Sequence, residues 1–127
     1  VILLGGPADA GIINAVGSQM KTRPHIFAGQ LPFGEIVALD HDARLYIGND
    51  TGLTHLSAAA GAKTAMILGP SDPKRYAPYT PESIALWKPA DLRSGGVAAG
   101  KSTSWDWVRD GISVEDATAQ ILDFLGV

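Results

Sequence analysis

The sequence has 127 residues, 46% of them hydrophobic and 18% charged, and it contains no cysteine. A chain of this length and composition is expected to fold as one soluble globular domain, without disulfides or a structural metal. The lack of cysteine excludes a disulfide framework, a zinc knuckle and a thiol nucleophile. The net charge of −3 disfavours nucleic acid as a partner. No apolar run approaches the roughly 20 residues of a membrane span.

Short apolar runs bounded by Gly, Pro or Asp predict buried parallel strands at 1–4, 25–28, 45–48, 65–68 and 83–87. Apolar residues at helical spacing predict helices between and after them, over 8–21, 33–42, 53–60 and 114–125. Strands that alternate with helices predict an α/β fold with a doubly wound parallel sheet. The stretch 89–104 lacks such a pattern, and we expect it to be a surface loop.

Local signals mark where several of these elements begin and end. Gly61 is placed to end the helix 53–60 in a left-handed conformation. Ser113, with Asp116 three residues later, predicts a capping box at the start of the last helix. The chain opens directly on the apolar strand 1–4, without an initiator methionine, and we therefore expect a fragment of a larger protein.

Parallel α/β sheets bind ligands outside the carboxyl ends of their strands, which directs attention to the turns 5–9, 29–34, 48–55 and 69–79. The turn 48–55 is rich in glycine and hydroxyl residues and joins a buried strand to a helix, which is typical of an anion site. Gly52 would let a phosphate approach the main chain, and His55 lies on the same face as Thr51. The structural alternative is that Asp50 or Thr51 is an ordinary N-cap.

Four turns of the chain, taken together, resemble the signature of the ADP-heptose:lipopolysaccharide heptosyltransferases, which form glycosyltransferase family 9. The residues that carry the resemblance, over 1 to about 80, are Gly5-Gly6-Pro7 with Asp9, Ala28-Gly29-Gln30-Leu31, Asp50-Thr51-Gly52 with His55, Ala58, Ala60 and Gly61, Gly69-Pro70-Ser71-Asp72-Pro73 and Pro78-Tyr79. The resemblance implies a Rossmann-like fold, as the donor-binding half of a two-domain GT-B enzyme. Residues 88–112 match nothing in the family's pattern.

The resemblance also implies roles for the residues of the turn 48–55. The family's aspartate at this position contacts hydroxyls of the donor sugar, which maps to Asp50. Its neighbours bind the pyrophosphate at the helix N-terminus, which maps to Thr51, Gly52 and His55. No cofactor and no metal are implied.

Two more site residues follow from the resemblance in the first third of the chain. An acidic residue after the Gly-Gly-Pro turn binds the ribose hydroxyls in the family, and here it is Asp9, one methylene shorter than the usual glutamate. Leu31 lines the adenine pocket. Each has a structural alternative, because Asp9 is also placed to cap the helix 8–21 and Leu31 to fill the core.

The implied reaction is inverting transfer of heptose, or a related sugar, from an ADP-sugar donor to the lipopolysaccharide core. The family's catalytic base is an aspartate of an amino-terminal domain, so we expect no catalytic residue in 1–127. These residues are then an incomplete carboxyl-terminal domain that is inactive alone. The intact enzyme is expected in the cytoplasm, peripheral to the inner membrane, and its oligomeric state is open.

The residues also admit other interpretations. The first is a complete, non-catalytic module that binds nucleotides or sugar phosphates. The segment 95–102 matches the Walker A pattern of a P-loop nucleotidase, but the residues before it are polar where a P-loop needs a buried strand. Asp50, His55 and Ser57 are too close in sequence for a hydrolase triad. The cluster 40–42 is interpreted as a solvated helix end and not as a metal site, because adjacent residues diverge around a helix.

Overall fold

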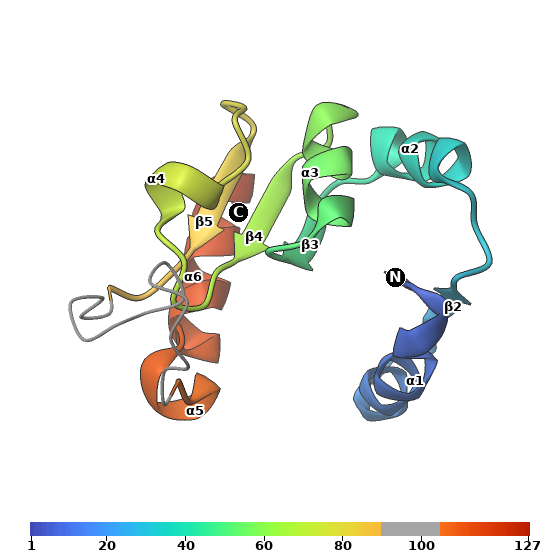
Figure 1. The fold of residues 1–127 in the computed structure, drawn as a ribbon, viewed down its shortest axis with the longest axis horizontal. Helices are drawn as coiled ribbons and strands as arrows, with labels where there is room; N and C mark the ends of the chain where they lie inside the picture. The colour runs from blue at the N-terminus through green and yellow to red at the C-terminus, as the bar shows by residue number, and fades with distance from the viewer. Residues whose placement is uncertain (90–104) are drawn as a thin grey trace. The chain divides into compact units, whose positions relative to one another are not determined.

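The computed structural model describes residues 1–89 and 105–127, and Figure 1 shows their helices and strands. These residues divide into two compact units, Val1–Ala38 and Leu39–Val127. The segment 95–102, with its Walker A pattern, lies outside the described residues, as does most of the loop expected over 89–104. The organisation of 1–127 as one incomplete domain stays a prediction.

The first unit is a β–α–β arrangement. Strands β1 (Ile2–Gly5) and β2 (His25–Ala28) are parallel, with Ile2 opposite His25 and Gly5 opposite Ala28. Between them, a 3₁₀ turn η1 (Pro7–Asp9) leads into helix α1 (Ala10–Gln19), which packs on both strands. Helix α2 (Phe33–Asp42) begins in this unit and ends in the second.

The second unit is built on three parallel strands in the order β3 (Tyr46–Asn49), β4 (Thr64–Ile67), β5 (Ser83–Leu86). Helix α3 (Gly52–Ala59) connects β3 to β4 and packs on both (Figure 1). The central strand β4 carries the core, because Ala65 and Met66 are fully buried. Two four-residue helices follow, α4 (Pro73–Tyr76) and α5 (Trp107–Asp110), and the last helix α6 (Val114–Leu125) contacts β5.

The fold confirms the α/β prediction, since every strand pair in the described residues is parallel and helices lie between the strands. The five strands lie where the apolar runs predict them, to within one residue at either end. The helices predicted over 33–42 and 114–125 are found with those bounds. The helix expected over 8–21 is shorter, since η1 occupies its first residues and Met20 is already extended.

The predicted helix ends are also present. Gly61 has a φ of +89°, which is the left-handed conformation expected after α3. At the start of α6, the Ser113 hydroxyl oxygen accepts a hydrogen bond from the amide of Asp116 at 3.0 Å. This contact is the half of the capping box that satisfies an otherwise unpaired amide of the first turn.

Candidate functional site

The residues 48–55, which we call the β3–α3 turn, place two unpaired amides at the start of α3. Thr51 stands at the N-cap position with φ −141° and ψ 163°, but its side chain makes no capping hydrogen bond. Within the described residues, the N–H groups of Gly52 and Leu53 donate to no acceptor of the chain. Thr51 is therefore an N-cap by position only, and the positive end of the helix dipole is left free for an anion.

Gly52 leaves the approach to these amides open. A Cβ atom built at Gly52 would have no heavy atom of the described chain within 4 Å, leaving out its immediate neighbours and the helix's own backbone. Gly48 differs, because a Cβ there would collide with the Thr54 hydroxyl and lie 2.6 Å from Cε1 of Tyr46. Gly48 thus brings the end of β3 against α3, while Gly52 keeps a free surface in front of the helix.

His55 and Asp50 face each other across the first turn of α3. His55 Nε2 lies 3.9 Å from Asp50 Oδ1, and both side chains are partly exposed. The His55 amide also points back to the Thr51 carbonyl oxygen at 3.4 Å. His55 is therefore on the face of the helix that carries the turn, as its spacing predicts, and the pair supplies one acidic and one basic group beside the open amides.

The turn after β1 is closed by Asp9. Asp9 Oδ2 accepts a hydrogen bond from the Gly6 amide at 2.8 Å, and the Asp9 amide donates to the Gly6 carbonyl oxygen at 3.0 Å across η1. Asp9 also precedes α1 at its N-cap position, but its side chain makes no capping bond to that helix. Asp9 therefore does not cap α1, and its exposed carboxylate has its other oxygen, Oδ1, outside the bond to Gly6.

The turn after β2 lies beside the turn after β1 in the first unit. The Gly29 amide donates to the Gly5 carbonyl oxygen at 2.7 Å. Gly29 has a φ of +66°, and a Cβ atom there would collide with the ring of Pro7. Leu31, which is half-buried, follows this close approach. The structure therefore brings Asp9 and Leu31 to neighbouring turns of one unit, and Asp50, Thr51, Gly52 and His55 to one turn of the other.

Asp40 corrects one interpretation of the sequence. The cluster 40–42 was expected to be a solvated helix end, but Asp40 is only 3% exposed and accepts a hydrogen bond from the Ser57 hydroxyl at 2.5 Å. Burial raises the pKa of Asp40, and the hydrogen bond from Ser57 opposes that shift. Its position four residues after the buried Ile36 was the available signal, because it places Asp40 on the inner face of α2.

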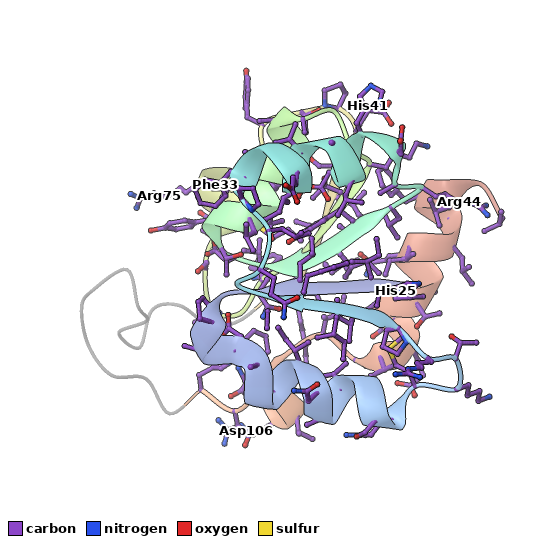
Figure 2. The ribbon with its side chains drawn as sticks, turned by 90° about the vertical axis from the view of Figure 1, so that its right-hand side faces the viewer. His25, Phe33, His41, Arg44, Arg75 and Asp106 are labelled. Atoms are coloured by element: carbon purple, nitrogen blue, oxygen red, sulfur yellow. The ribbon has the colours of Figure 1, made fainter. Side chains whose placement is uncertain are left out.

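His41 and Asp42 follow the expectation for a solvated end. His41 Nδ1 lies 3.3 Å from Asp42 Oδ1, and their side chains are 79% and 90% exposed. Figure 2 shows His41 near the carboxyl end of α2, with its side chain pointing outward from the helix. In the part of the chain that the structure describes, no three His, Cys, Asp or Glu side chains gather as a metal site. No described helix is both long enough and apolar enough to cross a membrane.

A family model for glycosyltransferase family 9 (heptosyltransferase) matches residues 1–94, which extends beyond the motifs at 1 to about 80. The chain belongs to glycosyltransferase family 9. This membership confirms the resemblance. The turns that carry it follow the carboxyl ends of the parallel strands β1 to β4, and Pro78-Tyr79 precedes β5.

Individual relatives agree with the family assignment. The chain is 30% identical over 90 residues to lipopolysaccharide heptosyltransferase 3 of Escherichia coli, and equally to the protein of that name from strain K12. The match covers 68% of this chain, but the chain spans only about a quarter (26%) of these relatives. The crystal structure of a family 9 glycosyl transferase from Veillonella parvula DSM 2008 superposes with a TM-score of 0.77 at 25% identity, over 98% of this chain and 36% of that one.

Proposed function

We propose that the chain is the donor-binding part of a glycosyltransferase that transfers heptose, or a related sugar, from an ADP-sugar to the lipopolysaccharide core. Family membership and the names of the Escherichia coli relatives support the sugar and the acceptor. The observation that carries the proposal is the start of α3, where the amides of Gly52 and Leu53 are unpaired and Thr51 does not cap them. Amides in this arrangement bind phosphate groups.

The chemistry proposed for this turn is stabilisation of the leaving group. As the bond between the sugar carbon and the diphosphate oxygen breaks, negative charge grows on the departing ADP. The fixed N–H dipoles of α3 and the His55 ring face that charge without having to reorganise. Asp50, 3.9 Å from His55, is the group proposed to bind the donor sugar's hydroxyls.

Residues of the first unit are proposed to bind the nucleoside. Asp9 would bind ribose hydroxyls through Oδ1, since Oδ2 is bonded to the Gly6 amide. Leu31 would line the adenine pocket. The acceptor hydroxyl would be deprotonated by an aspartate of another domain and would displace ADP with inversion, so the described chain is proposed to bind the donor without transferring the sugar.

Calorimetric titration of the protein with ADP tests this proposal. Gly52→Val places methyl groups where the phosphate approaches, and the open space around Gly52 means that they meet no other side chain. We expect the affinity for ADP to fall about tenfold or more, which corresponds to about 1.4 kcal/mol. Asp9→Ala is expected to weaken ADP binding more mildly, by the loss of contacts to the ribose.

Ala59→Val is the matched control for the valine at Gly52. It adds a β-branched side chain to the exposed last residue of the same helix, α3, at the end away from the β3–α3 turn. We expect this variant to bind ADP as the wild type does. An undiminished affinity in Gly52→Val would reject the helix N-terminus as the diphosphate site.

A further inference from the structure

Buried polar side chains on the inner face of α3 bond it to β3 and α2. Thr54 and Ser57 are fully buried, and Asp40 is 3% exposed. The Thr54 hydroxyl donates to the Asn49 carbonyl oxygen at 2.6 Å, which ties the first turn of α3 to the end of β3. The Ser57 hydroxyl contacts Asp40 Oδ2 at 2.5 Å, which ties the second turn of α3 to the last turn of α2.

Together with the packing of α3 on β3 and β4, these contacts set the direction of the open amides, since no side-chain cap fixes the first turn. Thr51 makes no side-chain bond at the N-cap, and its amide instead donates to the Asn49 carbonyl oxygen at 2.8 Å. The Asn49 carbonyl oxygen therefore accepts hydrogen bonds from both the Thr51 amide and the Thr54 hydroxyl. A rotation of α3 about its axis would break the contacts of Thr54 and Ser57 while it turned the amides away from their present direction.

The contact between Ser57 and Asp40 can form whether Asp40 is ionised or protonated. The Ser57 hydroxyl has one proton but two acceptors in reach, Asp40 Oδ2 at 2.5 Å and the Leu53 carbonyl oxygen at 2.9 Å. With an ionised Asp40, the hydroxyl donates to the carboxylate. With a protonated Asp40, the carboxyl donates to Ser57, and Ser57 donates to Leu53. In both protonation states, a hydrogen bond between Ser57 and Asp40 joins α3 to α2. When Asp40 is protonated, Ser57 also donates to Leu53, whose amide is one of the two unpaired amides.

We propose that Asp40 and Ser57 are positioning residues for the diphosphate, which hold α3 at the rotation that aims the amides of Gly52 and Leu53 at the ligand. The inference rests on the proposed function of the β3–α3 turn. Neither side chain is exposed, so neither touches the ligand. Since a buried polar pair is often no more stabilising than packed apolar groups, the role assigned to this pair is geometric.

The test compares Ser57→Ala with Thr64→Val. Thr64 is also fully buried, and its hydroxyl donates to the Ala62 carbonyl oxygen at 2.9 Å, at the amino end of β4 away from the turn. Each variant removes one buried hydroxyl from the same unit. ADP affinity is measured by calorimetry at a temperature at which circular dichroism shows both variants folded. We expect Ser57→Ala to lose about three- to thirty-fold in affinity and Thr64→Val to stay within about twofold of the wild type.

Two further measurements separate positioning from stability. Asp40→Asn keeps a hydrogen-bonding partner for Ser57 and is expected to retain most of the affinity that Asp40→Ala loses. If Asp40→Ala does not fold, Ser57→Ala carries the comparison. Amide NMR signals of Gly52 and Leu53, recorded without nucleotide, are expected to shift in Ser57→Ala and to stay in place in Thr64→Val.

Equal affinities of the wild type and Ser57→Ala, or equal losses in Ser57→Ala and Thr64→Val, would overturn the positioning role and leave the proposed function intact. Unmoved signals of Gly52 and Leu53 in Ser57→Ala would overturn it as well. A wild-type protein that does not bind ADP would overturn both proposals, so the wild-type titration distinguishes the two failures.

Discussion

Gly48 and Gly52 lie four residues apart in one turn and meet opposite surroundings. A side chain at Gly48 would collide with the Thr54 hydroxyl and the Tyr46 ring, whereas one at Gly52 would enter open space. The sequence predicts that Gly52 leaves room for a phosphate, but it does not predict that packing requires Gly48. That distinction depends on side chains from other elements, which only the folded chain brings into place.

Substitution by alanine separates the two glycines in stability. We expect Gly48→Ala to lower the free energy of unfolding by about 1–3 kcal/mol, because the added methyl group must displace packed atoms. Gly52→Ala is expected to leave it unchanged or raise it by up to about 1 kcal/mol, since alanine favours the helix. Urea denaturation of both variants measures the difference, and equal effects would contradict the packing assigned to Gly48.

The pH dependence of stability tests the burial of Asp40. Burial raises the pKa of Asp40 above its ordinary 3.8, so the folded state holds this proton more tightly than the unfolded state. The contribution of Asp40 to stability is therefore present below the unfolded pKa and is lost as the pH rises through the folded pKa. We expect the free energy of unfolding of Asp40→Asn, relative to the wild type, to increase as the pH rises above the ordinary carboxyl pKa of 3.8.

Urea denaturation of the two proteins at matched pH values measures this trend. Titration of all other groups is common to both, so the difference isolates Asp40. A difference that is constant with pH, or that falls as the pH rises, would contradict the raised pKa of Asp40.

Helices α3 and α6 begin in different ways, although both have a hydroxyl residue at the N-cap. Ser113 accepts a hydrogen bond from the Asp116 amide, whereas the side chain of Thr51 makes no capping bond. We expect Ser113→Ala to destabilise the protein by about 1 kcal/mol and Thr51→Ala by only a few tenths. Thermal and urea unfolding of the two variants check this contrast. An equal loss of stability would mean that the Thr51 side chain caps α3 and that the proposed anion site is an ordinary helix N-cap.

The bounds of helices were predictable where local signals are strong. The segment 114–125, with apolar residues at helical spacing and Ser113 before it, is such a case. Helices α4 and α5 have four residues each, too few for an apolar period to be visible. The contact of Asp40 with Ser57 joins residues 17 apart in sequence, and no local pattern reports which side chain a buried carboxyl will meet.

At the scale of the whole molecule, the order of strands and helices was readable because each parallel strand is a short apolar run followed by a turn and a helix. The same alternation placed the candidate residues at the carboxyl ends of strands. Asp9 and Leu31 belong to one compact unit and the β3–α3 turn to the other. Their assignment to a single nucleotide therefore comes from the family resemblance and stays a proposal.

A crystal structure of the protein with ADP is the most direct test of the diphosphate site. We expect phosphate oxygens within hydrogen-bonding distance of the Gly52 and Leu53 amides, with the His55 ring facing the same group and Ser57 still bonded to Asp40. A nucleotide bound elsewhere, with the start of α3 empty or covered by side chains, would contradict it.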